Sequence, residues 1–179
     1  KKTLILEHSS LLIRSKNSDI EKVSNRLSAL DTRVTNAITG GFLAAPYSYN
    51  VLNYPYSEGG IDGQNNAMQI KATSATSAQI YGAAGGGTTV SYWRQWSNSF
   101  KITGRPTVSW NTSYASNGNL LSSTLQVLEA STGAILLQTS NNASLDLSSL
   151  QGKNVKFKQV FTMDWIGTFT FSKLLLVNK

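Results

Sequence analysis

The sequence predicts a mainly β protein, with an N-terminal helix that forms a trimeric coiled coil and a β-sandwich head of jelly-roll-like type. A strict heptad repeat fills residues 18–39, and about nine short strand-like runs, separated by turn residues, follow in 67–179. Only 14% of the residues are charged, against about 25% in an average domain, and this favours strands and turns over surface helices. We expect four segments: an N-terminal connector (1–17), a coiled-coil stalk (18–39), a transition segment (40–66) and the β-sandwich head (67–179).

The stalk is predicted to begin at a capping box. Ser18 is a good N-cap and Glu21 follows three residues later, while Ser15–Ser18 indicates a break that sets residues 1–17 apart. The apolar triplets in 1–17 fit either short strands or an imperfect helix. From Ser18 to the Gly40-Gly41 stop, every core position of the heptad is apolar: Ile20, Leu27 and Val34 at a, and Val23, Leu30 and Ala37 at d.

Flanking charges favour self-association of this helix. Arg26 at g and Asp31 at e are five residues apart, the spacing that joins neighbouring helices of a parallel coiled coil. The stretch also resembles the R-h-x-x-h-E motif of short parallel trimeric coiled coils, with Asp in place of Glu. The resemblance implies a homotrimer held by Ile20, Val23, Arg26, Leu27, Leu30, Asp31 and Val34. An ordinary helix packed on the head is the alternative.

The head is predicted from runs of β-forming residues between turns. The expected strands are Ala67–Thr73, Ala78–Tyr81, Thr89–Trp96, Ser99–Thr103, Thr107–Tyr114, Leu120–Glu129, Ala134–Thr139, Asn154–Thr162 and Thr168–Val177. Alternation places two sets of side chains on common faces: Val108, Trp110, Thr112 and Tyr114, and Val155, Phe157, Gln159 and Phe161. In the transition segment, Pro, Asn and Tyr indicate irregular or edge-strand structure, followed by a loop over Ser57–Asn66.

Aromatic residues near turns are the candidate ligand-binding residues. A sugar ring stacks on a flat, exposed aromatic side chain with amide or hydroxyl neighbours. We expect Trp96, beside the Ser97-Asn98 turn, and Trp165 to be exposed in this way, with Asn98 as a hydrogen-bonding neighbour. The alternative is that these rings fill the sandwich core.

Catalysis and cofactors are not expected. The chain has no Cys and one His, His8, so neither a catalytic triad nor a zinc site can be assembled, and we name no catalytic or metal-binding residue. Glu58 and Asp62 are the only acidic residues of the head close together in sequence. The basic residues behind the net charge of +7 are scattered, and no apolar run could cross a bilayer, so neither nucleic acid nor membrane insertion is expected.

Two resemblances suggest a biological setting. The segment Leu145–Phe157 resembles a stretch of galactose-binding-like and carbohydrate-binding jelly-roll domains, in which an L-D-L-S turn precedes a G-K-x-V-x-F strand. The whole layout, a coiled coil before a small Cys-free β head, is similar to bacteriophage fibre and receptor-binding proteins. That likeness implies a virion surface component that contacts other virion proteins and binds a host cell-surface carbohydrate. A virion decoration protein without a ligand is the alternative.

Overall fold

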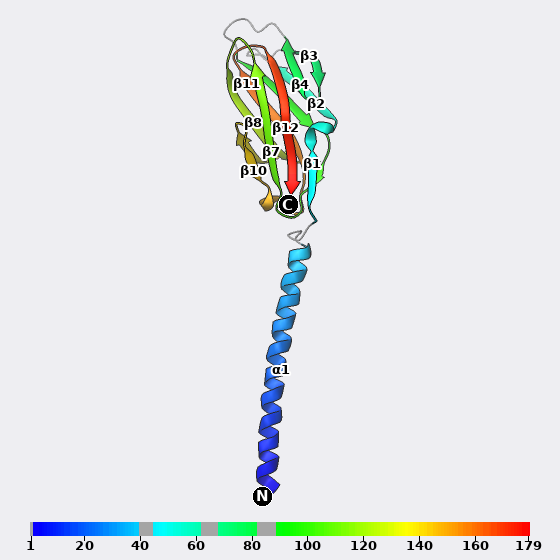
Figure 1. Cartoon of the computed structure of the whole chain (residues 1–179), viewed down its shortest axis with the longest axis vertical. Coiled ribbons are helices and arrows are strands. Elements are labelled where there is room, and N and C mark those ends of the chain that lie inside the picture. The colour runs from blue at the N-terminus through cyan, green and yellow to red at the C-terminus, as the bar shows by residue number, and fades with distance from the viewer. Residues whose placement is uncertain (1, 40–44, 62–67, 82–88) are drawn as a thin grey trace. The chain divides into compact units, whose positions relative to one another are not determined.

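The computed structural model describes residues 2–39, 45–61, 68–81 and 89–179 of the chain (Figure 1). The chain divides into two compact units, Lys1–Leu43 and Ala44–Lys179, and each is treated by itself below. The first unit contains one long helix, and the second contains two antiparallel sheets, which confirms the mainly β fold class. Within the described residues, no helix combines the length and hydrophobicity that a membrane span needs.

The helix α1 spans Lys2–Thr39 without interruption, about 57 Å at 1.5 Å per residue. The break predicted at Ser15–Ser18 is therefore wrong, and Ser18 lies inside the helix and does not cap it. Ser, Lys and Asn each cost at most about 0.7 kcal/mol relative to Ala in a helix, and this stretch has no Gly or Pro to stop one. Ile13 lies one heptad before Ile20, so the apolar a positions continue into the segment predicted as a connector.

The first sheet of the head has six strands in the order β10-β7-β12-β4-β3, with β1 pairing alongside β12. All of its pairings are antiparallel, as in a sheet built from hairpins and return connections. Its strands are β1 (Tyr47–Asn50), β3 (Gln69–Ser74), β4 (Ser77–Tyr81), β7 (Thr107–Ala115), β10 (Ser144–Asp146) and β12 (Thr168–Asn178).

The second sheet also has six strands, in the order β2-β5-β11-β8-β9, with β6 pairing alongside β11. Its strands are β2 (Tyr56–Ile61), β5 (Val90–Trp96), β6 (Phe100–Lys101), β8 (Leu120–Glu129), β9 (Ile135–Ser140) and β11 (Asn154–Met163). Two short 3-10 helices, η1 (Val51–Asn53) and η2 (Ser148–Leu150), lie in the connections. Each of the nine predicted strands overlaps one of these strands.

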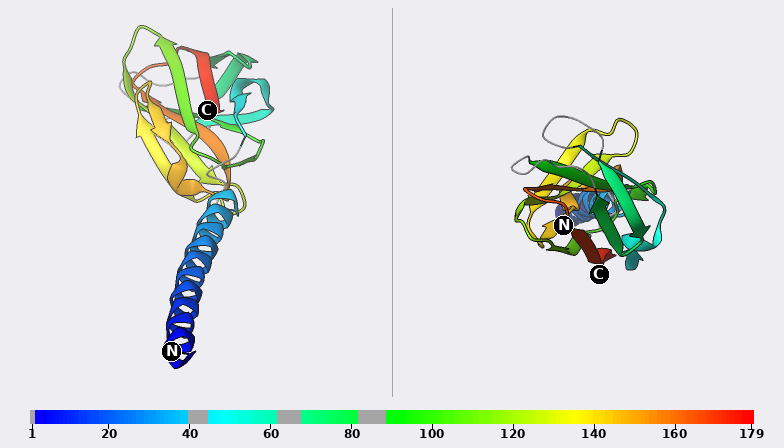
Figure 2. Two further views of the ribbon diagram at one scale, coloured as in Figure 1. Left: turned by 60° about the horizontal axis from the view of Figure 1, so that its bottom comes forward. Right: turned by 90° about the horizontal axis from the view of Figure 1, so that it is seen from above.

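Figure 2 shows the ribbon of the chain from two further directions. The described residues of the two sheets enclose an apolar core. Phe161 of β11 and Phe169 of β12 meet across it, with 4.4 Å between ring centroids, and Tyr92 of β5 stacks on Phe169 at 5.1 Å. The predicted faces are confirmed on β11, where Val155, Phe157, Gln159 and Phe161 are all buried, and on β7, where Val108, Trp110 and Thr112 are buried and Tyr114 is half-buried. Alternation along the chain is thus sufficient to place these side chains.

The transition segment is part of the head where the structure describes it; residues 40–44 and 62–66 lie outside the described residues. It supplies β1 to one sheet and β2 to the other, with η1 between them. The loop predicted from Ser57 is wrong as far as Ile61, because β2 covers this stretch. Its glycines fit the strand for a packing reason: a Cβ at Gly59 would lie 2.8 Å from the Trp93 ring.

Candidate functional site

The residues predicted to bind a ligand do not form one site. Trp96 is completely buried, edge-on to Phe171 at 6.3 Å, so the expectation of an exposed ring is wrong. The alternation of β5 places Trp96 on the inward face, where even the last residue of the strand is covered. Trp165 is 38% exposed and Asn98 is half-buried. Trp165 follows the end of β11, whereas Asn98 precedes β6, which pairs with the start of β11, so the two lie at opposite ends of the head.

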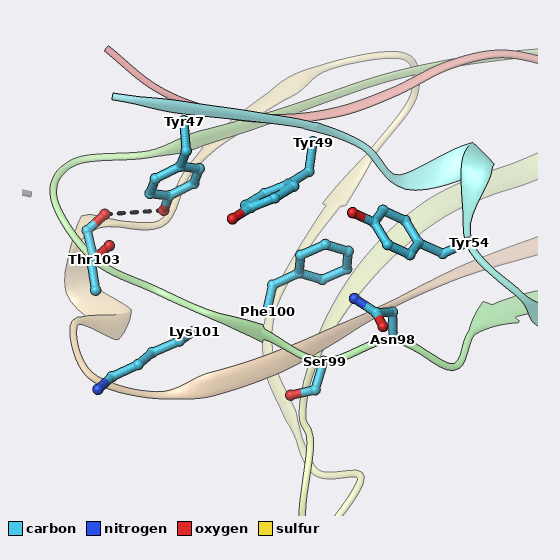
Figure 3. Close-up of a pocket in the computed structure, with 8 residues that line it drawn as sticks. All are labelled: Tyr47, Tyr49, Tyr54, Asn98, Ser99, Phe100, Lys101 and Thr103. Atoms are coloured by element: carbon cyan, nitrogen blue, oxygen red, sulfur yellow. Dashed lines mark hydrogen bonds between the residues drawn. The ribbon is translucent and has the colours of Figure 1, made fainter. Parts of the chain in front are cut away.

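An aromatic hollow of about 320 Å³ lies at the Asn98 end of the head (Figure 3). It lies between β1 and β6, and one residue from the connection after η1 completes it. Its lining contains four aromatic rings, three small polar side chains and one lysine: Tyr47, Tyr49, Tyr54, Phe100, Asn98, Ser99, Thr103 and Lys101. We call this hollow the tyrosine groove.

The strand β1 explains why the tyrosines gather in the tyrosine groove. Tyr47 and Tyr49 are two residues apart on one strand and therefore point to the same side. Their ring centroids are 5.3 Å apart, and Phe100 of β6 contacts Tyr49 at 5.5 Å and Tyr54 at 5.2 Å. The Tyr47 hydroxyl donates to the Thr103 carbonyl at 3.0 Å, which joins the two sheets at one end (Figure 3).

Only Asn98 among the lining residues was selected from the sequence. The usable signal for the others was the Tyr-Ser-Tyr-Asn run at 47–50, in which rings alternate with small polar residues as on a strand with one aromatic face. Tyr49 is 39% exposed, so the tyrosine groove combines open aromatic surface with amide and hydroxyl donors, while the exposed Lys101 lies at its margin. Such a lining binds ligands that offer apolar groups together with hydrogen-bond acceptors.

A second polar cluster lies inside the head, around the fully buried Arg94. Its Nη2 lies 2.8 Å from Glu58 Oε2, and the Tyr92 hydroxyl donates to the same oxygen at 2.6 Å. The guanidinium carbon also lies 4.0 Å from the ring centroid of Tyr56 and 4.1 Å from that of Phe171. The Nε–H of Arg94 also donates to Glu58 Oε2 at 3.1 Å, and its Nη1 and Nη2 donate to the carbonyls of Ser74, Ala75 and Ser77 at the β3–β4 turn.

This cluster connects the two sheets. Glu58 Oε2 accepts bonds from both the guanidinium of Arg94 and the phenol of Tyr92, so this oxygen is engaged within the cluster. Burial raises the pKa of Tyr92 far above its ordinary value, so this phenol stays protonated. The other acid noted from sequence, Asp62, lies outside the described residues. Glu58 therefore acts as the ionic partner of Arg94.

Acidic side chains elsewhere in the described head bind neighbouring turns. Asp164 accepts bonds from the main chain and the side-chain amide of Asn119, and these bonds lower its pKa. Asp146 accepts bonds from the main chain and hydroxyl of Ser148, which lowers its pKa in the same way. The residues that the structure describes contain no group of three His, Cys, Asp or Glu side chains placed to hold a metal ion.

Comparison with known proteins finds no matching family and no similar curated protein. Among solved structures, the chain is similar to accessory secretory protein 1, 2 and 3 of Streptococcus pneumoniae, at 11% identity and a TM-score of 0.43 over 67% of this chain and 95% of that one. The Glycosylation Associate Protein complex of Streptococcus agalactiae matches at 9% identity and a TM-score of 0.41, over 68% of this chain and 26% of that one. A cleaved adhesin domain of Lys-gingipain from Porphyromonas gingivalis matches at 13% identity and a TM-score of 0.34, over 75% of this chain and 98% of that one.

These comparisons overturn the setting predicted from the layout. The similar structures are bacterial secretion- or glycosylation-associated proteins and an adhesin domain, and none of the three is a bacteriophage fibre. The predictions of a virion fibre, of a virion location and of attachment to a host-cell glycan are therefore wrong, and the alternative of a virion decoration protein is equally unsupported. A coiled coil before a β head is an architecture that unrelated proteins share, so it does not identify a virion component.

Proposed function

We propose that this chain is the subunit of a homotrimeric binding protein, in which α1 joins three copies as a parallel coiled coil and the β heads bind a partner without catalysing a reaction. The observation that carries the proposal is the apolar stripe of α1. Its residues Ile20, Val23, Leu27, Leu30 and Val34 are each between 44% and 67% exposed in the single chain.

An exposed stripe of this kind needs a covering surface. A buried Leu or Ile side chain contributes about 1.5–3 kcal/mol relative to an exposed one, so the uncovered stripe forgoes a large stabilisation. A second copy of the same helix offers the same spacing of apolar residues, and the heptad keeps the two stripes in register. Arg26 and Asp31 add charge complementarity in a parallel arrangement, and their likeness to a known trimer motif favours three helices.

A binding role for the heads is supported by their chemistry. Glu58 is engaged with Arg94, and the only His of the chain is on α1, so the head offers little for acid–base catalysis. The tyrosine groove instead presents rings and hydrogen-bonding groups of the kind that bind ligands. Joining three heads raises the effective concentration of their sites, so that weak single sites can give strong binding to a partner with repeated epitopes.

Analytical ultracentrifugation of the full chain tests the assembly. We expect a species of three times 19.4 kDa at micromolar concentration. Replacing Leu27 and Leu30 together by Asp should give a monomer, because carboxylates buried without partners are costly. The matched control replaces Asn25 and Ala29 by Asp at outer positions of the same heptads, which adds two carboxylates and should keep the trimer. A wild-type monomer would refute the proposal.

A further inference from the structure

The tyrosine groove lies where each sheet has an open edge. β1 pairs with β12 and β6 pairs with β11, and neither has a second strand partner among the described residues. The neighbouring strand β2 runs beside β5 but ends its pairing at Tyr56 and Trp96, where the chain turns away through η1. On the side away from β11, β6 therefore has no strand partner among the described residues.

The main chain of Lys101 points to this open edge. Its neighbour Ile102 donates its N–H to the Lys153 carbonyl at 2.9 Å and so faces β11. Asn154 lies opposite Lys101 in the pairing of β11 with β6. Its carbonyl accepts a hydrogen bond from the Ala130 N–H at 2.9 Å and so points away from β6. Because main-chain groups of successive residues alternate in direction along an antiparallel strand, the N–H and C=O of Lys101 point away from β11.

Two hydrogen bonds mark the ends of the open edge. The Ser97 N–H donates to the Pro55 carbonyl at 2.9 Å, and the Thr103 carbonyl accepts from the Tyr47 hydroxyl at 3.0 Å. Between these two bonds lies Lys101. Strand pairing apart, its main chain forms no hydrogen bond with another described residue. Unpaired main-chain groups at a sheet edge are a template for an extended peptide.

The side chains around this edge define what such a peptide would carry. Tyr49, Tyr54 and Phe100 form a surface for an apolar or aromatic residue. No residue lining the tyrosine groove is acidic, and Lys101 has no ion-pair partner among the described residues. Glu129, which lines a neighbouring hollow, pairs with Lys153 at 3.5 Å. The exposed ammonium of Lys101 therefore favours an acidic residue in the ligand.

We propose that the tyrosine groove binds an extended segment of a partner protein, which adds as a strand to the outer edge of β6. One apolar or aromatic side chain of the segment lies in the tyrosine groove, and an acidic side chain lies beside Lys101. Phe100 is buried while Lys101 is exposed, so they lie on opposite faces of the sheet, and the aromatic and acidic residues of the ligand are an odd number of positions apart. This deepens the proposed function by naming the ligand class of the heads.

Selection from an mRNA-displayed library of random twelve-residue peptides, with the full-length protein as bait, tests the proposal. We expect enriched peptides to carry an acidic residue one or three positions from an apolar or aromatic residue. Lys101→Glu and Tyr49→Ala should each weaken the best peptide by about 30-fold or more, as removal of a central contact does. The matched control Lys173→Glu reverses an exposed charge on β12 and should leave binding unchanged.

N-methylation of the peptide separates strand addition from side-chain contact alone. A methyl group on the one amide that faces Lys101 should abolish binding, because it removes a ladder hydrogen bond, whereas a methyl group on the next amide should have little effect. Measuring the peptide on the monomeric Leu27 and Leu30 double variant separates the two proposals, since single-head affinity does not need the trimer. The inference would be overturned by absence of enrichment, by Tyr49 and Lys101 variants that bind the peptide as tightly as the wild type does, or by binding of glycans on an array in place of peptides.

Discussion

The two units of the chain differ in how far their apolar side chains are buried. The head encloses its aromatic core between two sheets, with residues such as Phe161 and Phe169 completely covered by the same chain. The helix α1 has no such partner within its own unit, and Leu27 is 66% exposed. A long helix without tertiary packing is only marginally stable in water. The head is therefore expected to be stable at any protein concentration, whereas the order of the helix is expected to depend on assembly.

This difference shows how one sequence can specify two kinds of contact. Alternation with a period of two, as in Val155–Phe161, directs side chains into a core that the chain closes by itself. The heptad with a period of 3.5 places Ile20 and Leu27 on one face of α1, which neighbouring helices would cover in the proposed trimer. A substitution in one unit, followed by measurement of both the stability of the head and the oligomeric state, shows whether the other unit is affected.

The largest expected effect follows from removing the buried cation of the head. Arg94→Met leaves Glu58 without its partner, and breaking a buried ion pair in this way costs about 3–5 kcal/mol. Because Arg94 also donates to the carbonyls of Ser74, Ala75 and Ser77, the β3–β4 turn should loosen as well. Urea unfolding should show the loss at all protein concentrations, while the sedimenting mass of the assembly stays the same.

A second substitution identifies which contact matters. The double variant Arg94→Met with Glu58→Leu has no unpaired charge and should recover part of the loss. If the single and double variants are equally unstable, the carbonyl contacts of Arg94, and not its ion pair, hold the two sheets together. If either variant changes the oligomeric state, the two units are not independent.

The sequence was sufficient for much of this fold because its signals are local. Strands such as Thr107–Ala115 follow from alternation, and the helical conformation of residues 18–39 follows from their heptad. Where the prediction was wrong, the cause was either a contact with a residue distant in sequence or a helix-propensity cost too small to end the helix. Gly59 reads as part of a loop but fits beneath Trp93, and Ser18 reads as a cap but is tolerated inside a helix. Trp96 reads as exposed beside a turn, yet β2 pairs with it and the core covers it.

The tyrosine groove could not be predicted because it depends on pairing across the chain. Tyr49 and Phe100 are 51 positions apart and come together only because β1 joins β12 while β6 joins β11. Local sequence shows that a strand has an aromatic face, but not which edge of which sheet that strand occupies. The same holds for Arg94, whose acid and carbonyl partners come from β2 and the β3–β4 turn.

An intermediate effect is expected from pH, and again only in the head. Burial raises the pKa of the Tyr92 phenol above its ordinary value of about 10. A group whose folded pKa is raised contributes stability that is complete below the unfolded pKa and is lost as the pH rises above it. The free energy of unfolding should therefore fall above about pH 10, by up to about 1.4 kcal/mol per pH unit from this group.

Tyr92→Phe should remove this contribution to the slope. Urea unfolding of wild type and variant between about pH 9 and pH 11.5 measures the difference, and Tyr49→Phe controls for loss of a hydroxyl at an exposed ring. Parallel curves for wild type and Tyr92→Phe would show that the phenol is not the titrating group.

The smallest expected effect is in the helix and tests its parallel, trimeric arrangement. Arg26→Glu places a carboxylate opposite Asp31 of the neighbouring helix, and Asp31→Arg in the same chain restores the attraction with the signs exchanged. Exposed ion pairs contribute about 0.2–1 kcal/mol each, so three pairs should change trimer dissociation by roughly 3- to 150-fold. Arg33→Glu is the matched control, since it changes the same heptad position but has Ile38, not an acid, five residues later. Because salt screens exposed charges, the loss in Arg26→Glu should shrink in 1 M salt. In an antiparallel assembly these g and e positions would not meet, and the charge-exchanged double variant would be no more stable than Arg26→Glu alone.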